Sequence, residues 1–227
     1  MTGAILNFFG VMKDGKYHVH YEICGTFFFI SPDTALTANH VIDKDFLNAD
    51  QNIINKQSFL VGENNFIAEI QKEFLIDHKD VDVSIIKFPK AQSETFFEIA
   101  KEEPIINQEL YFKGYTSENQ PLIETNCDKL KISLEKVDLS PLNLVSQDGF
   151  VKKLKSMTVK TADLDMDNVN VIELSCGGFV GMSGAPVIDK VSGKVIGLIS
   201  FGDTTDSDKK ETLFAIDCTE LNKIICN

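Results

Sequence analysis

The sequence lacks any long hydrophobic run. Its longest apolar stretch, TFFFI at residues 26–30, is only as long as a strand, whereas a membrane-spanning helix needs about 20 consecutive apolar residues. The opening residues, MTGAILNFFG, also lack the basic segment that begins a secretory signal peptide. We therefore expect a cytoplasmic protein that has no membrane partner.

Cysteine is scarce and scattered. The five cysteines form no CxxC pair and no cluster with histidine, so the sequence offers no zinc-binding pattern. Cytoplasmic thiols of this kind are expected to stay reduced and mostly buried. We predict no metal and no cofactor. Cys176 is the one cysteine near a glycine-rich loop, which makes it a minor alternative as a nucleophile.

Positive charge is in short supply. The chain has 22 Lys and Arg residues against 34 Asp and Glu residues, a formal net charge of -12 at pH 7. A surface of this sign repels a phosphate backbone, so we expect no nucleic-acid partner. With 43% hydrophobic and 25% charged residues, the chain can still bury a core.

Helix signals are few, and strand signals are many. Stretches that are rich in β-branched and aromatic residues and alternate in polarity indicate strands. They lie at residues 16–30, 35–42, 58–62, 66–76, 81–88, 109–115, 129–137, 157–161, 170–176, 185–189, 193–202 and 212–217. Turns are expected at 189–195 and 202–213, helical turns at 40–48 and 146–156, and a helix at 218–226. Many short strands with few helices are typical of β-sandwiches and β-barrels.

The polar stretch 89–107 has a proline near each end. We place the boundary between two halves there, which predicts one domain at residues 1–100 and a second at residues 101–227.

A serine in a glycine-rich stretch, Ser183 in CGGFVGMSGAPV (176–187), raises the question of a nucleophile. A serine hydroxyl needs a base to attack, and histidine is the usual one. All four histidines precede Ser183. This excludes the α/β-hydrolase order, in which the histidine comes last, and leaves the order histidine, aspartate, serine.

Of the four histidines, His40 is the best candidate for the base. His18 and His20 alternate on a predicted strand, where surface positions explain them, and His78 lies in a polar loop. His40 instead ends an apolar strand that follows a turn. A base needs such a rigid support at the edge of an open cleft.

Four motifs of the chain resemble the trypsin-like proteases of the high-temperature-requirement type. GTFFFISPDTALTANHVI (25–42) is similar to their histidine motif, and VDVSIIKF (81–88) to the strand whose first aspartate orients the histidine. GMSGAPV (181–187) resembles their serine loop, and GKVIGLISFG (193–202) the hairpin that lines their substrate cleft. The resemblance covers roughly residues 20–90 and 170–220.

This resemblance implies an all-β fold of two six-stranded antiparallel β-barrels, chymotrypsin-like, to which we add the expected short C-terminal helix. The first barrel carries His40 and Asp82, and the second carries Ser183. The implied activity is that of a serine endopeptidase that acts through an acyl-enzyme. His40 is the base, Asp82 orients it, and Ser183 attacks, while the N–H groups of Gly181 and Ser183 form the oxyanion hole. Asp80 is the alternative to Asp82, which leads directly into the strand.

The resemblance also implies where a protein or peptide substrate binds. The cleft strand corresponds to Ser200, Phe201 and Gly202, whose main chain would pair with an extended substrate. The Ser200 side chain would also touch Asp82. The floor of the specificity pocket corresponds to Gly177, Gly178 and Phe179, with Ala215 on its back wall. None of these is charged, which predicts a preference for apolar or small residues.

The chain departs from secreted trypsin-like enzymes at Met182. Relatives that are made as zymogens carry an aspartate directly before the serine, and here that residue is methionine. No activation site and no PDZ module are recognised in the sequence. We expect control by a partner protein, a fused sensor domain or loop ordering. Two alternatives stay open: a catalytically silent trypsin-like module that binds peptides, and a β-sandwich adhesion module.

Overall fold

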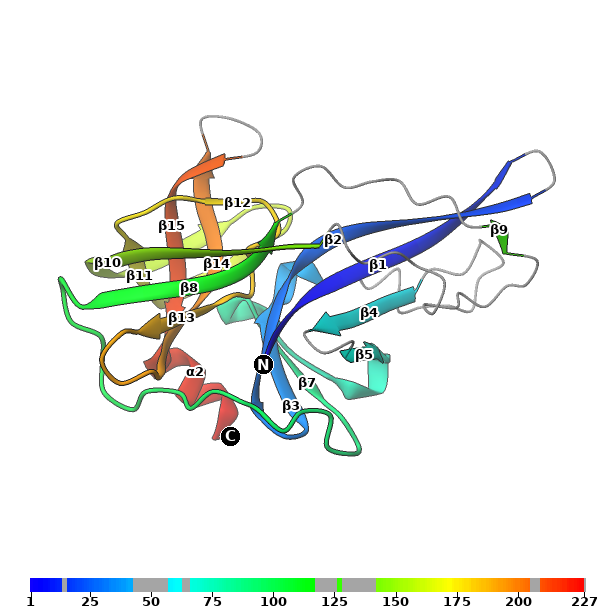
Figure 1. Cartoon of the computed structure of the whole chain (residues 1–227). Coiled ribbons are helices and arrows are strands. Elements are labelled where there is room, and N and C mark those ends of the chain that lie inside the picture. The colour runs from blue at the N-terminus through cyan, green and yellow to red at the C-terminus, as the bar shows by residue number, and fades with distance from the viewer. Residues whose placement is uncertain are drawn as a thin grey trace.

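The computed structural model describes most of the chain. The described residues are 1–13, 16–42, 57–62, 66–116, 126–127, 142–204 and 209–226. Nearly all of its regular structure is β (Figure 1). Among the described residues, none of the helices has the length and apolar character that crossing a membrane requires.

The first sheet is antiparallel and comes mainly from the N-terminal part of the chain. Its strands are β1 (Thr2–Lys13), β2 (Lys16–Ser31), β3 (Thr34–Ala38), β4 (Gln57–Gly62), β5 (Phe66–Glu69), β6 (Leu75–His78), β7 (Val83–Lys87) and β9 (Asn126–Cys127). They are ordered β5-β4-β1-β2-β3-β7-β6, and β9 pairs with β2. The short helices η1 (Asn39–Val41), η3 (Lys72–Phe74) and η4 (Lys79–Val81) lie between its strands.

The second sheet closes on itself. Its strands are β8 (Glu109–Thr116), β10 (Asn143–Lys160), β11 (Asp165–Leu174), β12 (Gly178–Phe179), β13 (Pro186–Asp189), β14 (Val195–Thr204) and β15 (Lys209–Asp217). The order is β11-β10-β8-β13-β14-β15, and a further pairing of β11 with β15 completes the ring. Strand β12 adds to the outside of this ring by pairing with β15. Figure 1 shows the two sheets side by side.

The helix α2 (Cys218–Ile225) ends the described chain and has a clear start signal. The side chain of Asp217 accepts the N–H groups of Thr219 at 2.9 Å and Glu220 at 3.1 Å. This bond pattern satisfies two of the free donors at a helix start. Burial raises the pKa of Asp217 against the effect of these hydrogen bonds.

The phenylalanines of the TFFFI stretch are fully buried on both faces of β2. Phe27 and Phe29 make an edge-on contact at 5.7 Å inside the first barrel, and Phe66 packs on Phe29 at 5.6 Å. Phe28 contacts Phe97 at 6.0 Å, and the N–H of Phe97 donates to the carbonyl of Phe29 at 2.8 Å. The stretch around Phe97 therefore covers the outer face of β2, which explains an unbroken apolar run in an antiparallel strand.

The expected fold class is confirmed: the chain is all-β, with two barrel-like sheets of the chymotrypsin type and a short C-terminal helix. The sheets contain eight and seven strands among the described residues, rather than six each, because short strands such as β9 and β12 add to them. The closed ring of the second sheet has the expected six. The domain boundary near residue 100 stays a prediction.

Two expectations about single elements were wrong. The single strand predicted at 66–76 is divided into β5, η3 and β6. The predicted helical turn at 146–156 lies inside β10, which pairs with β8 on one side and β11 on the other. The strand at Thr2–Lys13 was not expected. The predicted strand at 129–137, most of the helical turn at 40–48 and the centre of the 202–213 turn lie outside the described residues.

Candidate active site

His40 is fixed at the end of β3 by Asp82. Its backbone N–H donates to Oδ1 of Asp82 at 3.0 Å, and its ring Nδ1 lies 2.9 Å from Oδ2. The neighbouring Asn39 donates its backbone N–H to the carbonyl of Asp82 at 3.1 Å, and its side chain donates to Ser84 at 2.7 Å. The His40 side chain keeps 21% exposure, so the ring is anchored on one edge and accessible elsewhere.

Asp82 is buried and adopts an unusual backbone conformation. It is 2% exposed, and it ends η4 with a left-handed φ of 54° and ψ of 44°. This conformation disfavours side chains other than those of Gly, Asn and Asp. Its N–H donates to the carbonyl of Lys79 at 3.2 Å. The turn directs the carboxylate back toward His40, and strained residues of this kind cluster at functional sites.

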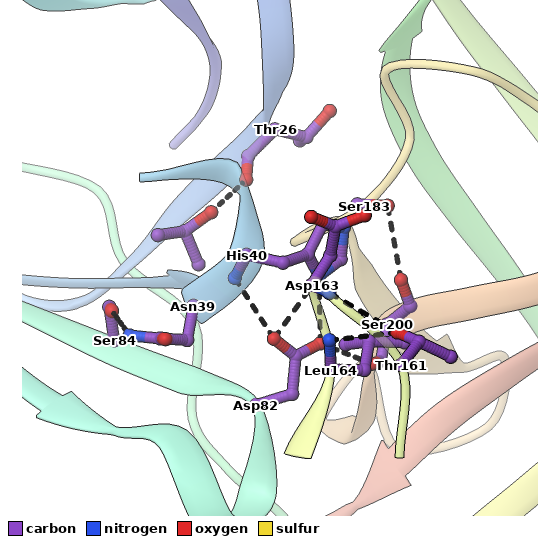
Figure 2. Close-up of polar contacts among 11 residues, drawn as sticks. Thr26, Asn39, His40, Asp82, Ser84, Thr161, Asp163, Leu164, Ser183 and Ser200 are labelled. Atoms are coloured by element: carbon purple, nitrogen blue, oxygen red, sulfur yellow. Dashed lines mark hydrogen bonds and ion pairs between the residues drawn. The ribbon is translucent and has the colours of Figure 1, made fainter. Parts of the chain in front are cut away.

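Ser200 brings the second barrel to Asp82 through a β-bulge. The pairing of β14 with β15 shifts register between Ile199 and Phe201, so that Ser200 is the extra residue. Such bulges redirect side chains beside active sites. The hydroxyl of Ser200, which is fully buried, donates to Oδ2 of Asp82. The carboxylate thus receives donors from both barrels (Figure 2).

Ser183 is 6% exposed, and its hydroxyl contacts Ser200. Its Oγ donates to the carbonyl oxygen of Ser200 at 3.1 Å. Among the described residues, no hydrogen bond joins Ser183 to His40. Ser200 therefore connects Ser183 to Asp82, with its carbonyl to one and its hydroxyl to the other (Figure 2).

Two backbone donors of the serine loop have no partner within the described chain. Gly181 has a φ of 95°, which only glycine adopts freely. Its N–H and the N–H of Ser183 donate to no other group in the described part of the chain. By contrast, the N–H of Met182 donates to the carbonyl of Phe179 at 3.3 Å. The two donors expected for an oxyanion hole are therefore available.

Two glycines let the barrels meet directly behind Ser183. Gly184 has a φ of 88°, and a Cβ on it would lie 2.0 Å from the carbonyl oxygen of Thr26 in β2. A Cβ on Gly25 would lie 2.8 Å from the carbonyl oxygen of Ser183. The N–H of Thr26 donates to that same oxygen at 2.8 Å. Larger residues at either glycine would force the serine loop away from the first barrel.

The segment expected to floor the specificity pocket is held against β15. Gly178 and Phe179 form β12, and a Cβ on Gly178 would lie 2.7 Å from the Leu213 side chain. The N–H of Phe179 also donates to the sulfur of Met182 at 3.4 Å, and Met182 is fully buried. Ala215 is fully buried in the same apolar cluster as Met182.

A cavity of about 320 Å³ opens beside His40 and was not foreseen from the sequence. The first barrel lines it with Asn39, His40, Ile42, Lys79 and Asp82, and the β10–β11 turn closes its other side with residues 162–165. Figure 2 shows Asp163 and Leu164 of this turn near His40.

The β10–β11 turn is internally bonded. Thr161 donates its N–H to the carbonyl of Leu164 at 2.7 Å, and its hydroxyl accepts the N–H of Leu164 at 3.0 Å. Asn168, with a φ of 54°, marks a bulge that bends the hairpin. The predicted strands at 157–161 and 170–176 imply a connection here, but no local motif places that connection beside His40.

The alternative candidates Asp80 and Cys176 do not join this arrangement among the described residues. Asp80 is exposed, and in the described chain it makes no hydrogen bond to His40. Burial raises the pKa of Cys176 to about 11, so little of it is thiolate near neutral pH. His78 ends β6, while the side chains of His18 and His20 lie outside the described part. The described residues contain no group of three or more His, Cys, Asp or Glu side chains placed to hold a metal.

Residues 25–198 match the family model of the trypsin-like peptidase domain, well over half of the chain. The chain belongs to the trypsin-like peptidases. It is therefore a serine protease by family, in agreement with the motifs around His40 and Ser183. The comparison with curated protein sequences found no match.

Solved structures of proteases share the fold at low sequence identity. The active form of the Rv3671c protease from M. tuberculosis has a TM-score of 0.61 at 17% identity, over 98% of this chain and 79% of that one. The HtrA-type protease AlgW with a decapeptide has a TM-score of 0.67 at 11% identity, over 99% of this chain and 62% of that one. The serine endoprotease from Yersinia pestis gives 0.53 at 14% identity, over 98% and 61% of the two chains.

Proposed function

We propose that this trypsin-like peptidase is an endopeptidase that works through an acyl-enzyme, with His40, Asp82 and Ser183 as its triad. The observation that carries the proposal is the carboxylate of Asp82, which lies 2.9 Å from Nδ1 of His40. The same carboxylate accepts the hydroxyl of Ser200, whose carbonyl contacts Ser183. The base contacts the orienting group directly, and Ser200 links the orienting group to the nucleophile.

The proposed reaction begins at Nε2 of His40. An ionised carboxylate only accepts hydrogen bonds, so the ring nitrogen that faces Asp82 carries the proton and Nε2 has the free lone pair. Ser183 Oγ attacks the scissile carbonyl carbon while its proton passes to Nε2. His40 then protonates the leaving amine as the C–N bond breaks, and a water molecule repeats the sequence to release the acyl group.

The oxygen of the tetrahedral intermediate would be stabilised by the N–H groups of Gly181 and Ser183. Their lack of other acceptors within the described chain supports this role. One such donor typically contributes a factor of about 10²–10³ to kcat. The positive φ of Gly181 supports it as well, because a side chain would disfavour this backbone turn.

A peptide is the proposed substrate, bound as an added strand along Ser200, Phe201 and Gly202. AlgW structures that contain a tripeptide or a decapeptide support a ligand of this class. The floor formed by Gly177, Gly178 and Phe179 has no charge, so a small or apolar side chain is expected before the cut.

A catalytically silent peptide-binding module is the second candidate. It is favoured by one contact: the Ser183 hydroxyl donates to the Ser200 carbonyl, with no described hydrogen bond to His40. In the endopeptidase, this hydroxyl must rotate about its Cα–Cβ bond to reach Nε2 of His40. For the endopeptidase we also propose control by a partner, a fused sensor or loop ordering. Met182 supports this, because zymogens use an aspartate at that position and methionine has no charge to bind a new N-terminus.

Fluorophosphonate labelling separates the two candidates. The wild type should become covalently labelled, whereas Ser183→Ala and His40→Ala should not. Ser192→Ala, which removes an exposed serine of the β13–β14 turn, should label like the wild type. If the folded wild type never reacts, even with its cellular partners added, the endopeptidase proposal fails. A peptide-library digest with Ser183→Ala as the blank then gives the cleavage preference.

A further inference from the structure

Thr26 lies on β2, fully buried where the two barrels meet. Each of its hydrogen-bonding groups has a partner in the described chain. Its N–H donates to the Ser183 carbonyl at 2.8 Å, and its carbonyl accepts the hydroxyl of Thr37 at 2.7 Å. Its hydroxyl accepts the N–H of Tyr115 at 2.9 Å and donates to the carbonyl of Gly181 at 3.0 Å.

The direction of the hydroxyl bond to Gly181 follows from these partners. A backbone N–H can only donate, so the bond from Tyr115 occupies a lone pair of the Thr26 oxygen. The hydroxyl hydrogen is then free to serve the carbonyl of Gly181. One side chain of the first barrel thereby joins strand β8 to the loop before Ser183, and both belong to the second barrel.

Two of these four bonds hold the residues whose N–H groups are the proposed oxyanion donors. The carbonyls of Gly181 and Ser183 both accept from Thr26. The peptide that joins Gly181 to Met182 is held at both ends, because its N–H donates to Phe179 while its oxygen accepts from Thr26. Apart from these bonds, a glycine at a φ of 95° offers little resistance to rotation.

We propose that the Thr26 side chain is a positioning residue for the oxyanion hole: its hydroxyl keeps Gly181 in the orientation that presents the N–H group to substrate. The inference rests on the proposed function. A buried carbonyl that loses its partner is unfavourable, so the loop would rearrange to regain one. Gly181 lies in a position where this rearrangement is easy.

Residue 26 needs a hydroxyl because that group accepts one hydrogen bond and donates another. Valine has the shape of threonine but offers neither donor nor acceptor, whereas serine offers both. Gly25 supports the same contact from the chain side, because any side chain there would lie against the Ser183 carbonyl. Gly25 therefore lets the serine loop approach β2 closely, and Thr26 places a hydroxyl against the carbonyl of Gly181.

The test compares Thr26→Val and Thr26→Ser with the wild type. The control is Ser58→Ala, which removes another buried hydroxyl of the first barrel, bonded to Asn7 at 2.5 Å. We expect Thr26→Val to lower kcat by about 10- to 100-fold with KM nearly unchanged, less than the loss of a whole donor. Peptide aldehydes, which form a tetrahedral oxyanion, should bind more weakly by a similar factor. Thr26→Ser should have most of the wild-type kcat and aldehyde affinity, and Ser58→Ala should keep the wild-type values of the two.

A second measurement does not depend on activity. In ¹⁵N-labelled protein, the amide resonance of Gly181 should be single in the wild type and broadened or multiple in Thr26→Val, with Ser58→Ala like the wild type. Unchanged Gly181 and Ser183 resonances in folded Thr26→Val, or an unchanged kcat in an active enzyme, overturn the role of Thr26. If the wild type has no peptidase activity, the proposed function fails, and the Gly181 resonance still decides whether Thr26 orders the loop.

Discussion

The carboxylate of Asp82 contacts His40 at two points: it accepts the backbone N–H at 3.0 Å, and it lies 2.9 Å from the ring Nδ1. The first contact fixes the position of the His40 backbone, and the second fixes the orientation of its imidazole ring. A left-handed residue at the end of a one-turn helix provides both. Orientation of the imidazole therefore depends on one buried side chain and on the backbone turn that directs it.

Replacing this carboxylate should leave the fold and remove most of the activity. In Asp82→Asn the amide group presents a donor as well as an acceptor, which permits the wrong tautomer of His40, and kcat should fall by about 10⁴-fold. Steady-state kinetics on a peptide from the library digest measures it. Asp80→Asn is the matched control and should keep normal activity. Equal losses in the two variants would contradict the assignment of Asp82.

Gly184 should tolerate no side chain. Gly184→Ala places a Cβ 2.0 Å from the Thr26 carbonyl at a φ of 88°. The conformation costs about 1–2 kcal/mol, and the overlap adds about 1–3 kcal/mol. Urea unfolding should show this loss, together with slower fluorophosphonate labelling.

Gly193 provides the control for that prediction. It has a φ of 70°, but a Cβ on it would meet nothing within 4 Å. Gly193→Ala should therefore lose only the conformational part, about 1–2 kcal/mol, and label at the normal rate. If both variants lose equal stability, the close approach of the barrels is not what makes Gly184 necessary.

Glu173 should make stability fall in acid. Hydrogen bonds from Lys152 at 2.8 Å and Lys155 at 2.7 Å lower its pKa from 4.5 to about 2, against the opposing effect of burial. Because the folded pKa is lower than the unfolded one, the contribution is complete above pH 4.5 and is lost as the pH falls toward about 2.

Urea midpoints of the wild type and Glu173→Gln should therefore differ at pH 6 and converge toward pH 2. Glu94→Gln changes an exposed carboxylate that makes no ion pair in the described chain, and its midpoints should follow those of the wild type. A constant gap between wild type and Glu173→Gln across this interval would exclude the ion pairs as its cause.

The two thiols with a raised pKa, one half-buried and one buried, should resist alkylation. Burial is the main cause that raises the pKa of Cys176 to about 11 and that of Cys218 to about 12, whereas Cys226 is exposed. Iodoacetamide at pH 8 should modify Cys226 and leave the other two until urea unfolds the chain. Peptide mapping by mass spectrometry reads the sites. Rapid modification of Cys176 in the folded protein would support the alternative that Cys176 is the nucleophile.

The residues of the site could be predicted from the sequence better than the contacts between them. His40, Asp82 and Ser183 lie in motifs with a fixed local pattern, so their order along the chain could be interpreted. The contact of Ser200 with Asp82 was expected only from the resemblance, because the bulge that makes it arises from a register shift between two strands. The contact of Thr26 joins residues 155 apart. Long-range pairings of this kind leave no local periodicity to detect.

The fold shows the same limit at β10. Residues 146–156 contain a lysine-rich stretch with a helical appearance, yet residues 146–150 pair with β8 and the residues from 151 on pair with β11. Strand propensity depends strongly on neighbours, and pairing with a neighbouring strand along its whole length outweighs a weak local preference for helix. The β10–β11 turn beside His40 was missed for a related reason, because only the bend of this hairpin brings it there.

The glycines behind Ser183 have a consequence for how the enzyme can be controlled. In the proposed mechanism, base and nucleophile are carried by different barrels, so their separation is set by the docking of two units. A displacement of about 1 Å costs about 10²-fold in rate, far less movement than unfolding requires. In that mechanism, a slight movement between two folded barrels would lower the catalytic rate reversibly, without either barrel unfolding.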